Sequence, residues 1–243
     1  MKVGGVQEIS TLDWPGRTCT VVFFQGCNLR CPWCQNPGLI SQDGGRKMGK
    51  EDLREFLRKA GRLVDSVLVS GGEPTLQPDG ILELAGICGE LGMELGMETN
   101  GTLPHRLEGL LSHLSFVSVD VKAPLSDGSL YLRAIGGGPE GVEERVRRTL
   151  EILRDSGLPF EVRTTVVPTL NANPEIVDRL ARDLRGLADS LCLLQFRPSG
   201  VLDPSYRRLG APTREEMLSL GRVARRWLGR VRIYTFEAGL EEL

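Results

Sequence analysis

The chain has 243 residues, 40% of them hydrophobic, which is enough for the core of one large α/β domain or two small ones. Its 30 basic and 32 acidic side chains give a net charge of −2, and this balance argues against a nucleic-acid-binding protein. No apolar run reaches the length of a membrane span, and the N-terminal residues do not resemble a signal peptide. We therefore expect a cytoplasmic protein that does not bind a membrane.

Segments typical of strands and of helices alternate along the chain. Strands are expected at 18–25, 65–70, 93–98, 116–121, 160–167, 191–196 and 231–235, and the last of these could form an edge. Helices are expected at 50–61, 80–91, 103–111, 142–156, 174–184 and 213–228. The interval 124–138 reads as irregular, and its three final glycines favour a mobile loop.

This alternation predicts an α/β fold with a parallel sheet and helical crossovers. We expect a single domain over residues 1–243, with its core at about 18–200 and a C-terminal helix and strand at 213–235. The expected architecture is an incomplete parallel (β/α)6-type barrel. Nearly every expected strand ends in polar residues or glycine, and the active site of such a barrel forms at the C-terminal ends of its strands.

Three of the six cysteines lie close together, as Cys27, Cys31 and Cys34 in a C-x3-C-x2-C spacing. In a reducing compartment this clustering points to a metal rather than to disulfides. A structural zinc site would be the main alternative, but it usually needs a second cysteine pair that the chain lacks. Three thiolates on a [4Fe–4S] cluster leave one iron open to a substrate. The other cysteines lie in or beside apolar runs and are interpreted as small hydrophobic side chains: Cys19, Cys88 and Cys192.

The spacing closely resembles that of the radical S-adenosylmethionine (SAM) superfamily, in which an aromatic residue such as Trp33 commonly precedes the last cysteine. The resemblance implies that the three cysteines hold a [4Fe–4S] cluster whose open iron binds the amino and carboxylate groups of SAM. An electron from the cluster then breaks the S–C5′ bond, and the 5′-deoxyadenosyl radical abstracts a hydrogen. The protein positions the cofactors and excludes competing reactions.

Further motifs match the SAM-binding residues of this family. Gly71, Gly72 and Glu73 precede a proline and match the family's GGEP motif, although taken alone these residues also favour an ordinary turn. The resemblance implies that this strand edge meets the methionine amino group of SAM, with Glu73 supporting the site. Other residues that the resemblance places near SAM would otherwise be read as surface or strand-end polar residues: Asp120, Lys122, Arg163 in R-x-x-V-V-P, Gln195 and Arg197. Arg197 stands where the formate-lyase activase has a histidine.

Two strand ends resemble those of the glycyl-radical-enzyme activases, which carry D-T-N-G and D-x-K at these places. In the pyruvate formate-lyase activase these residues surround a monovalent cation beside the SAM carboxylate. The resemblance implies that Glu98, Thr99 and Asp120 bind such a cation, with the Ser118 carbonyl as a further ligand. Glutamate replaces aspartate at position 98. When the resemblance is left aside, the segment that contains Glu98 and Thr99 indicates an Asn-Gly turn, and the segment that contains Asp120 indicates a half-exposed strand.

The segment Asp13-Trp14-Pro15-Gly16 precedes the first expected strand, and alone it indicates a Pro-Gly turn. In activases the matching D-x-P-G segment lies near the peptide substrate, and Trp14 resembles the branch that activates anaerobic ribonucleoside-triphosphate reductase. The resemblance implies a glycyl radical enzyme as partner, anaerobic ribonucleotide reductase in particular. It also implies Asp13 as a substrate contact and an electron donor of the flavodoxin or ferredoxin type.

Two other functions stay open. One is a radical SAM enzyme that acts on a small molecule, such as a deazapurine or a cofactor precursor. The other is an iron–sulfur or zinc protein without enzymatic activity. The chain has no second set of four cysteines for an auxiliary cluster, and a short chain leaves a partial barrel open to a protein loop. Both features favour the activase.

Overall fold

The computed structural model describes all 243 residues, and the chain divides into two compact units. The first unit comprises residues 1–28, 38–99 and 105–117, and the second comprises 29–37, 100–104 and 118–243. One boundary falls inside the cysteine motif, between Asn28 and Leu29, and another falls inside strand β6 (Phe116–Asp120). No helix combines the length and the apolar character needed to cross a membrane.

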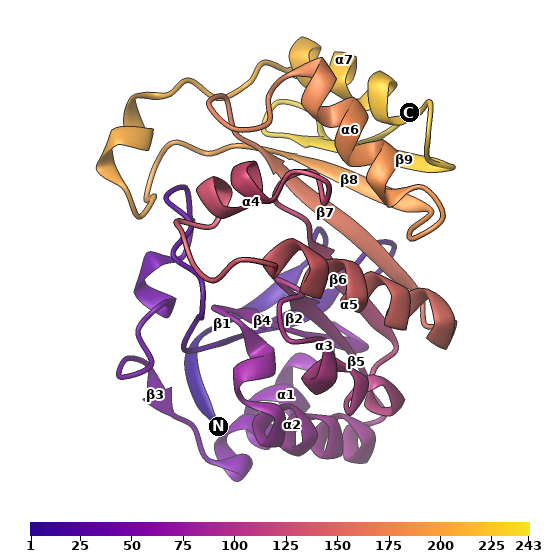
Figure 1. The fold of residues 1–243 in the computed structure, drawn as a ribbon. Helices are drawn as coiled ribbons and strands as arrows, with labels where there is room; N and C mark the ends of the chain where they lie inside the picture. Colours follow the sequence, from indigo (N-terminus) through magenta and orange to yellow (C-terminus); the bar gives the residue numbers. More distant parts are fainter. The chain divides into compact units, whose positions relative to one another are not determined.

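In the first unit, three parallel strands follow one another in the sheet: β2 (Cys19–Phe24), β4 (Ser66–Gly71) and β5 (Glu94–Thr99). Strand β1 (Lys2–Ser10) pairs antiparallel with β2 and with the two-residue strand β3 (Arg46–Lys47). Helices α1 (Lys50–Ala60) and α2 (Pro78–Leu91) lie next to each other beside these strands, and the short helix α3 (Pro104–Glu108) follows β5 (Figure 1).

The indole of Trp14 anchors the segment that precedes β2. Trp14 is buried and stacks on Phe116, with ring centroids 5.3 Å apart and an interplanar angle of 23°. It packs against Val21 and Leu68, which pair in register on β2 and β4. Gly96 leaves room for the ring, because a Cβ at that position would lie 2.7 Å from the indole. An aromatic pair of this kind adds about 0.5–1.5 kcal/mol beyond the area that it buries.

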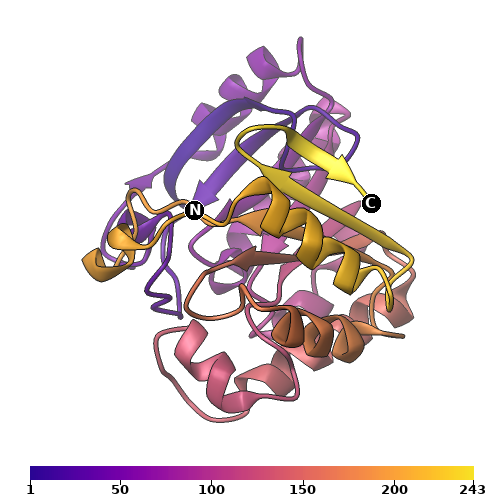
Figure 2. The same cartoon turned by 90° about the horizontal axis from the view of Figure 1, so that it is seen from above.

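In the second unit, β7 (Phe160–Val166), β8 (Ser190–Gln195) and β9 (Arg230–Thr235) run parallel, and β10 (Gly239–Glu242) pairs antiparallel with β9. Helices α6 (Pro174–Leu184) and α7 (Arg214–Ala224) lie side by side over β8 and β9 (Figures 1 and 2). Helix α4 (Gly128–Ala134) and helix α5 (Val142–Ser156) come between β6 and β7 in the chain.

The predicted α/β class and each expected strand and helix are present, with ends that differ by a few residues. The interpretation of 124–138 as irregular is wrong, because it contains α4, whose first turn is capped by the Asp127 side chain. The prediction also lacks β1, β3 and β10, and β9 is not an edge because β10 pairs with it. Strand β10 is short and half acidic, so its pairing with β9 left no hydrophobic pattern to detect.

Candidate active site

The glycines that end β4 lie against the residues that end β2. The backbone N–H of Gly72 donates to the carbonyl of Phe24 at 3.0 Å, and that of Glu73 donates to the carbonyl of Gly26 at 2.8 Å. A Cβ on Gly72 would lie closer than 3.0 Å to the carbonyl oxygens of both Gly26 and Leu39. Only glycine therefore fits here, and its absence of a side chain brings the Gly-Gly-Glu segment against the residue that precedes Cys27.

Main-chain hydrogen bonds hold Cys27 itself. Its N–H donates to the carbonyl of Ile40 at 3.0 Å, and the N–H of Gly26 donates to the carbonyl of Leu39 at 2.7 Å. The buried Gln25 side chain donates to the carbonyls of Gly38 and Ser41 at 2.9 and 2.7 Å. The exit of β2 is thus fixed by a ladder to residues 38–41, and the ladder does not use the Cys27 side chain.

Glu73 is completely buried and joins the ends of β4 and β5. Its Oε1 accepts hydrogen bonds from the Thr75 N–H at 3.0 Å, the Thr75 hydroxyl at 2.5 Å and the Thr99 hydroxyl at 2.8 Å. Between the same two strands, the Ser70 hydroxyl of β4 donates to Oε2 of Glu98 on β5 at 2.7 Å. Glu73 and Thr99 are therefore in direct contact. Asp120 belongs to the second unit, and its convergence with Glu98 and Thr99 stays a prediction.

Residues 29–37 form the cysteine loop of the second unit, which carries Cys31 and Cys34. The Cys34 N–H donates to the Cys31 carbonyl at 3.0 Å, which closes a tight turn. Two residues from later in the chain bind the loop. The Asp203 N–H donates to the Pro32 carbonyl at 2.8 Å, and the Gln35 side chain donates to the Arg197 carbonyl at 2.7 Å.

A buried lysine lies next to this loop. Nζ of Lys122 is 3.1 Å from the Asp120 carboxylate and 4.9 Å from the centroid of the Trp33 ring. Burial alone would lower the pKa of Lys122, but the charges of Asp120 and of an ionised Cys31 outweigh it and raise the pKa. Burial raises the pKa of the Cys34 thiol, while the Asn36 backbone and Lys122 oppose this shift. A permanent ammonium beside the loop favours thiolates.

These residues fit an iron–sulfur cluster. Thiolate sulfur is the donor that such clusters use, and a cation close to the loop offsets the negative charge of the bound sulfurs. Trp33, which immediately precedes Cys34 in the chain, and Lys122 stack in a buried pair. The buried cysteines elsewhere differ: burial alone raises the pKa of Cys88 to about 12, and burial raises that of Cys192 to about 11.

Three other predicted residues lie on β7, on β8 and just after β8. Arg163 is buried in mid-strand, where its Nε is 3.2 Å from a Glu161 carboxylate oxygen. The Gln195 side chain is also buried: it accepts from the Phe236 N–H at 2.7 Å and donates to the Pro212 carbonyl at 2.7 Å. The Arg197 guanidinium lies 5.1 Å from the centroid of the Phe236 ring. Gln195 thus connects two loops, and a role of these residues in SAM binding stays a prediction.

Asp13 lies in the loop before β2. Its carboxylate accepts a short hydrogen bond from the Ser10 hydroxyl, and the Ser10 oxygen accepts from the Asp13 N–H at 3.3 Å. The adjacent Trp14 is buried, whereas Asp13 is half-buried. The contact with Ser10 fixes the direction of the side chain. Its proposed contact with substrate stays a prediction.

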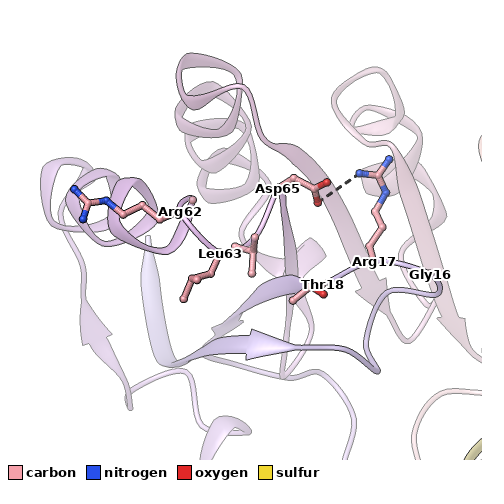
Figure 3. A pocket seen from close by; sticks show the side chains of 8 residues that line it. Gly16, Arg17, Thr18, Arg62, Leu63 and Asp65 are labelled. Atoms are coloured by element: carbon pink, nitrogen blue, oxygen red, sulfur yellow. Dashed lines mark ion pairs between the residues drawn. The ribbon is translucent and has the colours of Figure 1, made fainter.

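A separate hollow of about 610 Å³ opens at the amino ends of β2 and β4 (Figure 3). Arg17 pairs there with Asp65 at 3.6 Å and with Glu94 at 2.8 Å, and its guanidinium lies 5.5 Å from the Trp14 ring centroid. In Figure 3, Arg62 extends away from this ion pair. The hollow contains none of the predicted site residues, and partly exposed ion pairs of this type contribute about 0–1 kcal/mol each.

Sequence reasoning missed several residues that hold the predicted ones in place. Ser70 and Thr75 bind Glu98 and Glu73, and Gln35 binds the Arg197 carbonyl just after β8. Tyr131 of α4 accepts from the Lys122 N–H at 3.5 Å. Only Thr75 had a usable signal, because a threonine two residues after a glutamate in a Glu-Pro turn is placed to bond with it.

The strands, their helical crossovers and the cysteine-bearing loop after β2 define a radical SAM enzyme. Residues 21–181 match the Radical SAM superfamily, and the chain belongs to this family. The chain is 29% identical over 244 residues to a glycyl-radical enzyme activating enzyme of Methanocaldococcus jannaschii, with 98% of each chain covered. It is also 29% identical to the pyruvate formate-lyase-activating enzyme of Clostridium pasteurianum, covering 90% of this chain and 94% of that one.

A solved radical SAM methyltransferase from Sphaerobacter thermophilus shares the fold, with a TM-score of 0.70 at 18% identity over 94% of this chain and 71% of that one. The predicted incomplete barrel of the radical SAM kind, the enzyme class, and the [4Fe–4S] and SAM cofactors are confirmed. The resemblance to the glycyl-radical activase group is confirmed as well. The alternative of a protein without enzymatic activity is therefore set aside.

Proposed function

We propose that the protein is an activating enzyme that removes a hydrogen atom from the Cα of a glycine in a partner protein, with the cluster held by Cys27, Cys31 and Cys34. One observation carries the proposal: relatives that match at least 90% of both chains are named as glycyl-radical or formate-lyase activating enzymes. A small-molecule radical SAM enzyme remains the competing function. None of the relatives reported above that match this much of both chains is named as an enzyme of that kind.

A reduced cluster held by Cys27, Cys31 and Cys34 would supply one electron for the cleavage of SAM into methionine and a 5′-deoxyadenosyl radical, and this radical would become 5′-deoxyadenosine by taking the glycine hydrogen. The chain's own residues bind and orient. We assign the backbone of Gly71 and Gly72 to the methionine amino group and the Lys122 ammonium to the carboxylate. Glu73 supports the turn through Thr75 and Thr99. The nucleoside is assigned to residues on or just after β7 and β8: Arg163, Gln195 and Arg197.

A monovalent cation is a further part of the proposal. Glu98 and Asp120 are two carboxylates, and bringing them together without a cation would raise the pKa of one of them. A cation bound by these two and Thr99 would remove that repulsion. We expect replacement of potassium by lithium or a bulky organic cation to slow SAM cleavage by about tenfold, a change worth about 1.4 kcal/mol. SAM cleavage that is indifferent to the cation would exclude this site.

The partner is proposed to be an enzyme of the anaerobic ribonucleotide reductase type, on the basis of Asp13-Trp14-Pro15-Gly16. A peptide that crosses the active site in an extended form would be bound mainly through its backbone. The half-buried Asp13 carboxylate is our candidate contact for that peptide. The proposed reductant is a flavodoxin- or ferredoxin-type protein, and dithionite replaces it in the test.

The test is an anaerobic incubation with SAM, dithionite and a candidate reductase, followed by electron paramagnetic resonance. A glycyl radical on the partner is the expected result. Asp13→Ala should keep SAM cleavage without partner and lower the radical yield at least tenfold, as expected for a loss of about 1.4 kcal/mol in positioning. Asp52→Ala, an exposed aspartate of α1, is the control and should change neither.

Two outcomes would count against this function. If Asp13→Ala lowers cleavage and radical yield equally, Asp13 serves folding or SAM binding instead. If deuterium reaches 5′-deoxyadenosine from a purine or another small metabolite, and none comes from a glycine-deuterated partner, the enzyme acts on a small molecule.

A further inference from the structure

Helix α4 ends against the cysteine loop. The last carbonyls of a helix have no partner within it, and other groups must satisfy them. Here the Trp33 indole N–H donates to the Ala134 carbonyl at 3.0 Å, and the Arg30 backbone N–H donates to the Ile135 carbonyl at 3.1 Å. Both donors belong to residues 29–37, and the indole bond is buried. The C-terminal end of α4 therefore binds the loop on each side of Cys31.

The next residue, Gly136, makes the closest approach. A Cβ on Gly136 would lie closer than 3.0 Å to both the carbonyl oxygen and the carbonyl carbon of Arg30. These are backbone atoms, so a side chain at 136 could be accommodated only by moving the chain next to Cys31. Gly136 has a φ of 79° and Gly137 a φ of 87°, conformations that both favour glycine. A Cβ on Gly137 would meet nothing within 4 Å.

The same helix also reaches the exit of β6. The Tyr131 side chain is buried, and its hydroxyl accepts from the Lys122 N–H. Lys122 in turn lies over the Trp33 ring. Two turns of α4 thus contact both the loop that carries Cys31 and Cys34 and the strand end that carries Asp120 and Lys122. This differs from a mobile glycine loop, which was the expectation from the sequence.

We propose that the C-terminal turn of α4 is a brace for the cysteine loop, and that Gly136 is a positioning residue that sets the place of Arg30 and thereby of Cys31. The proposal rests on the assignment of the cluster to Cys27, Cys31 and Cys34. In this proposal glycine is required at position 136 because the chain there approaches the Arg30 backbone closely, and not because the segment must be flexible. The contact with Arg30 fixes the loop before the cluster is loaded.

The test compares Gly136→Ala with Gly137→Ala in the full chain. Both variants place a side chain at positive φ, so both should lower the melting temperature, and Gly136→Ala should lower it further because its Cβ also meets the Arg30 backbone. In the apo protein, hydrogen exchange of peptides containing Arg30 and Cys31 should become at least tenfold faster in Gly136→Ala alone. After anaerobic loading, Gly136→Ala should also weaken SAM binding at least fivefold and shift the resonance spectrum of the reduced cluster.

Equal exchange and equal SAM affinity in the two variants would overturn the brace and leave Gly136 a backbone requirement only. Wild-type protein that takes up no iron would instead count against the proposed function, so the two failures are distinguishable. If Gly136→Ala does not fold, Trp33→Phe decides, because it removes the indole N–H that donates to the Ala134 carbonyl at the end of α4. We expect faster hydrogen exchange of the peptides containing Arg30 and Cys31 in its apo form, and exchange at the wild-type rate would refute the brace.

Discussion

The two parts of the cysteine motif are held by different kinds of contact. Cys27 follows β2 and is fixed by main-chain bonds to residues 38–41 and by the close approach of Gly72 to Gly26. Cys31 and Cys34 lie in a loop that also has main-chain bonds, at Arg30 and Pro32, but depends in addition on two of its own side chains, the indole of Trp33 and the amide of Gln35. Main-chain bonds thus predominate around Cys27, with Gln25 as a further side-chain contact, whereas the Trp33 and Gln35 contacts of the second part can be altered one side chain at a time.

This difference separates two tasks. A main-chain ladder gives one ligand a fixed place, because its bonds join backbone groups that are present whatever the side chains are. Side-chain contacts around the other two ligands allow the sequence to adjust charge and position near them, as Lys122 does. Substitutions in the two parts should therefore differ in kind: loss of folding in the first, and graded changes in cofactor binding in the second.

The largest effect is expected from the loss of any one of the three cysteines, whichever part of the motif it belongs to. Cys27→Ala, Cys31→Ala and Cys34→Ala should each abolish SAM cleavage, because a cluster with two thiolate ligands lacks the coordination that it needs. Iron content and the release of 5′-deoxyadenosine measure this loss. The control variants are the isolated cysteines, and Cys19→Ala, Cys88→Ala and Cys192→Ala should keep the activity. Full activity in Cys31→Ala would end the assignment.

The main-chain contacts around Cys27 should be disrupted by a substitution at Gly72. Gly72→Ala puts a Cβ into the carbonyls of Gly26 and Leu39, and overpacking of this kind costs about 1–3 kcal/mol. We expect a lower unfolding temperature and weaker iron loading. Gly86→Ala is the matched control: this exposed glycine of α2 has nothing within 4 Å of its Cβ position, and alanine there should stabilise by about 0.5–1 kcal/mol. A Gly72→Ala protein as stable as Gly86→Ala would show that the close approach is not required.

The sequence was sufficient for the fold and for the cysteines because both depend on local patterns. Apolar runs at the spacing of strands and helices predicted the sheet, and C-x3-C-x2-C is a contiguous signal. The contacts of Glu73 and Gln195 were not predictable in the same way. Glu73 binds Thr99, 26 residues away, and Gln195 binds the main chain at Phe236, 41 residues away, so both depend on the completed fold. Helix α4 was hidden because Gly128 begins it, and glycine favours turns over helices.

The side-chain contacts around Cys31 and Cys34 should weaken gradually when Trp33 is replaced by smaller side chains. Trp33→Phe keeps an aromatic face for Lys122 but leaves the buried Ala134 carbonyl without its donor, a loss of about 1 kcal/mol or somewhat more. Trp33→Leu also removes the cation–π contact, which adds about 0.5–2 kcal/mol. We expect SAM affinity, measured on loaded protein, to fall in the order wild type, Trp33→Phe, Trp33→Leu, with iron content unchanged. If both variants lose iron completely, as expected of the cysteine variants, the loop is as rigidly required as the β2 exit, and the contrast between the two parts of the motif does not hold.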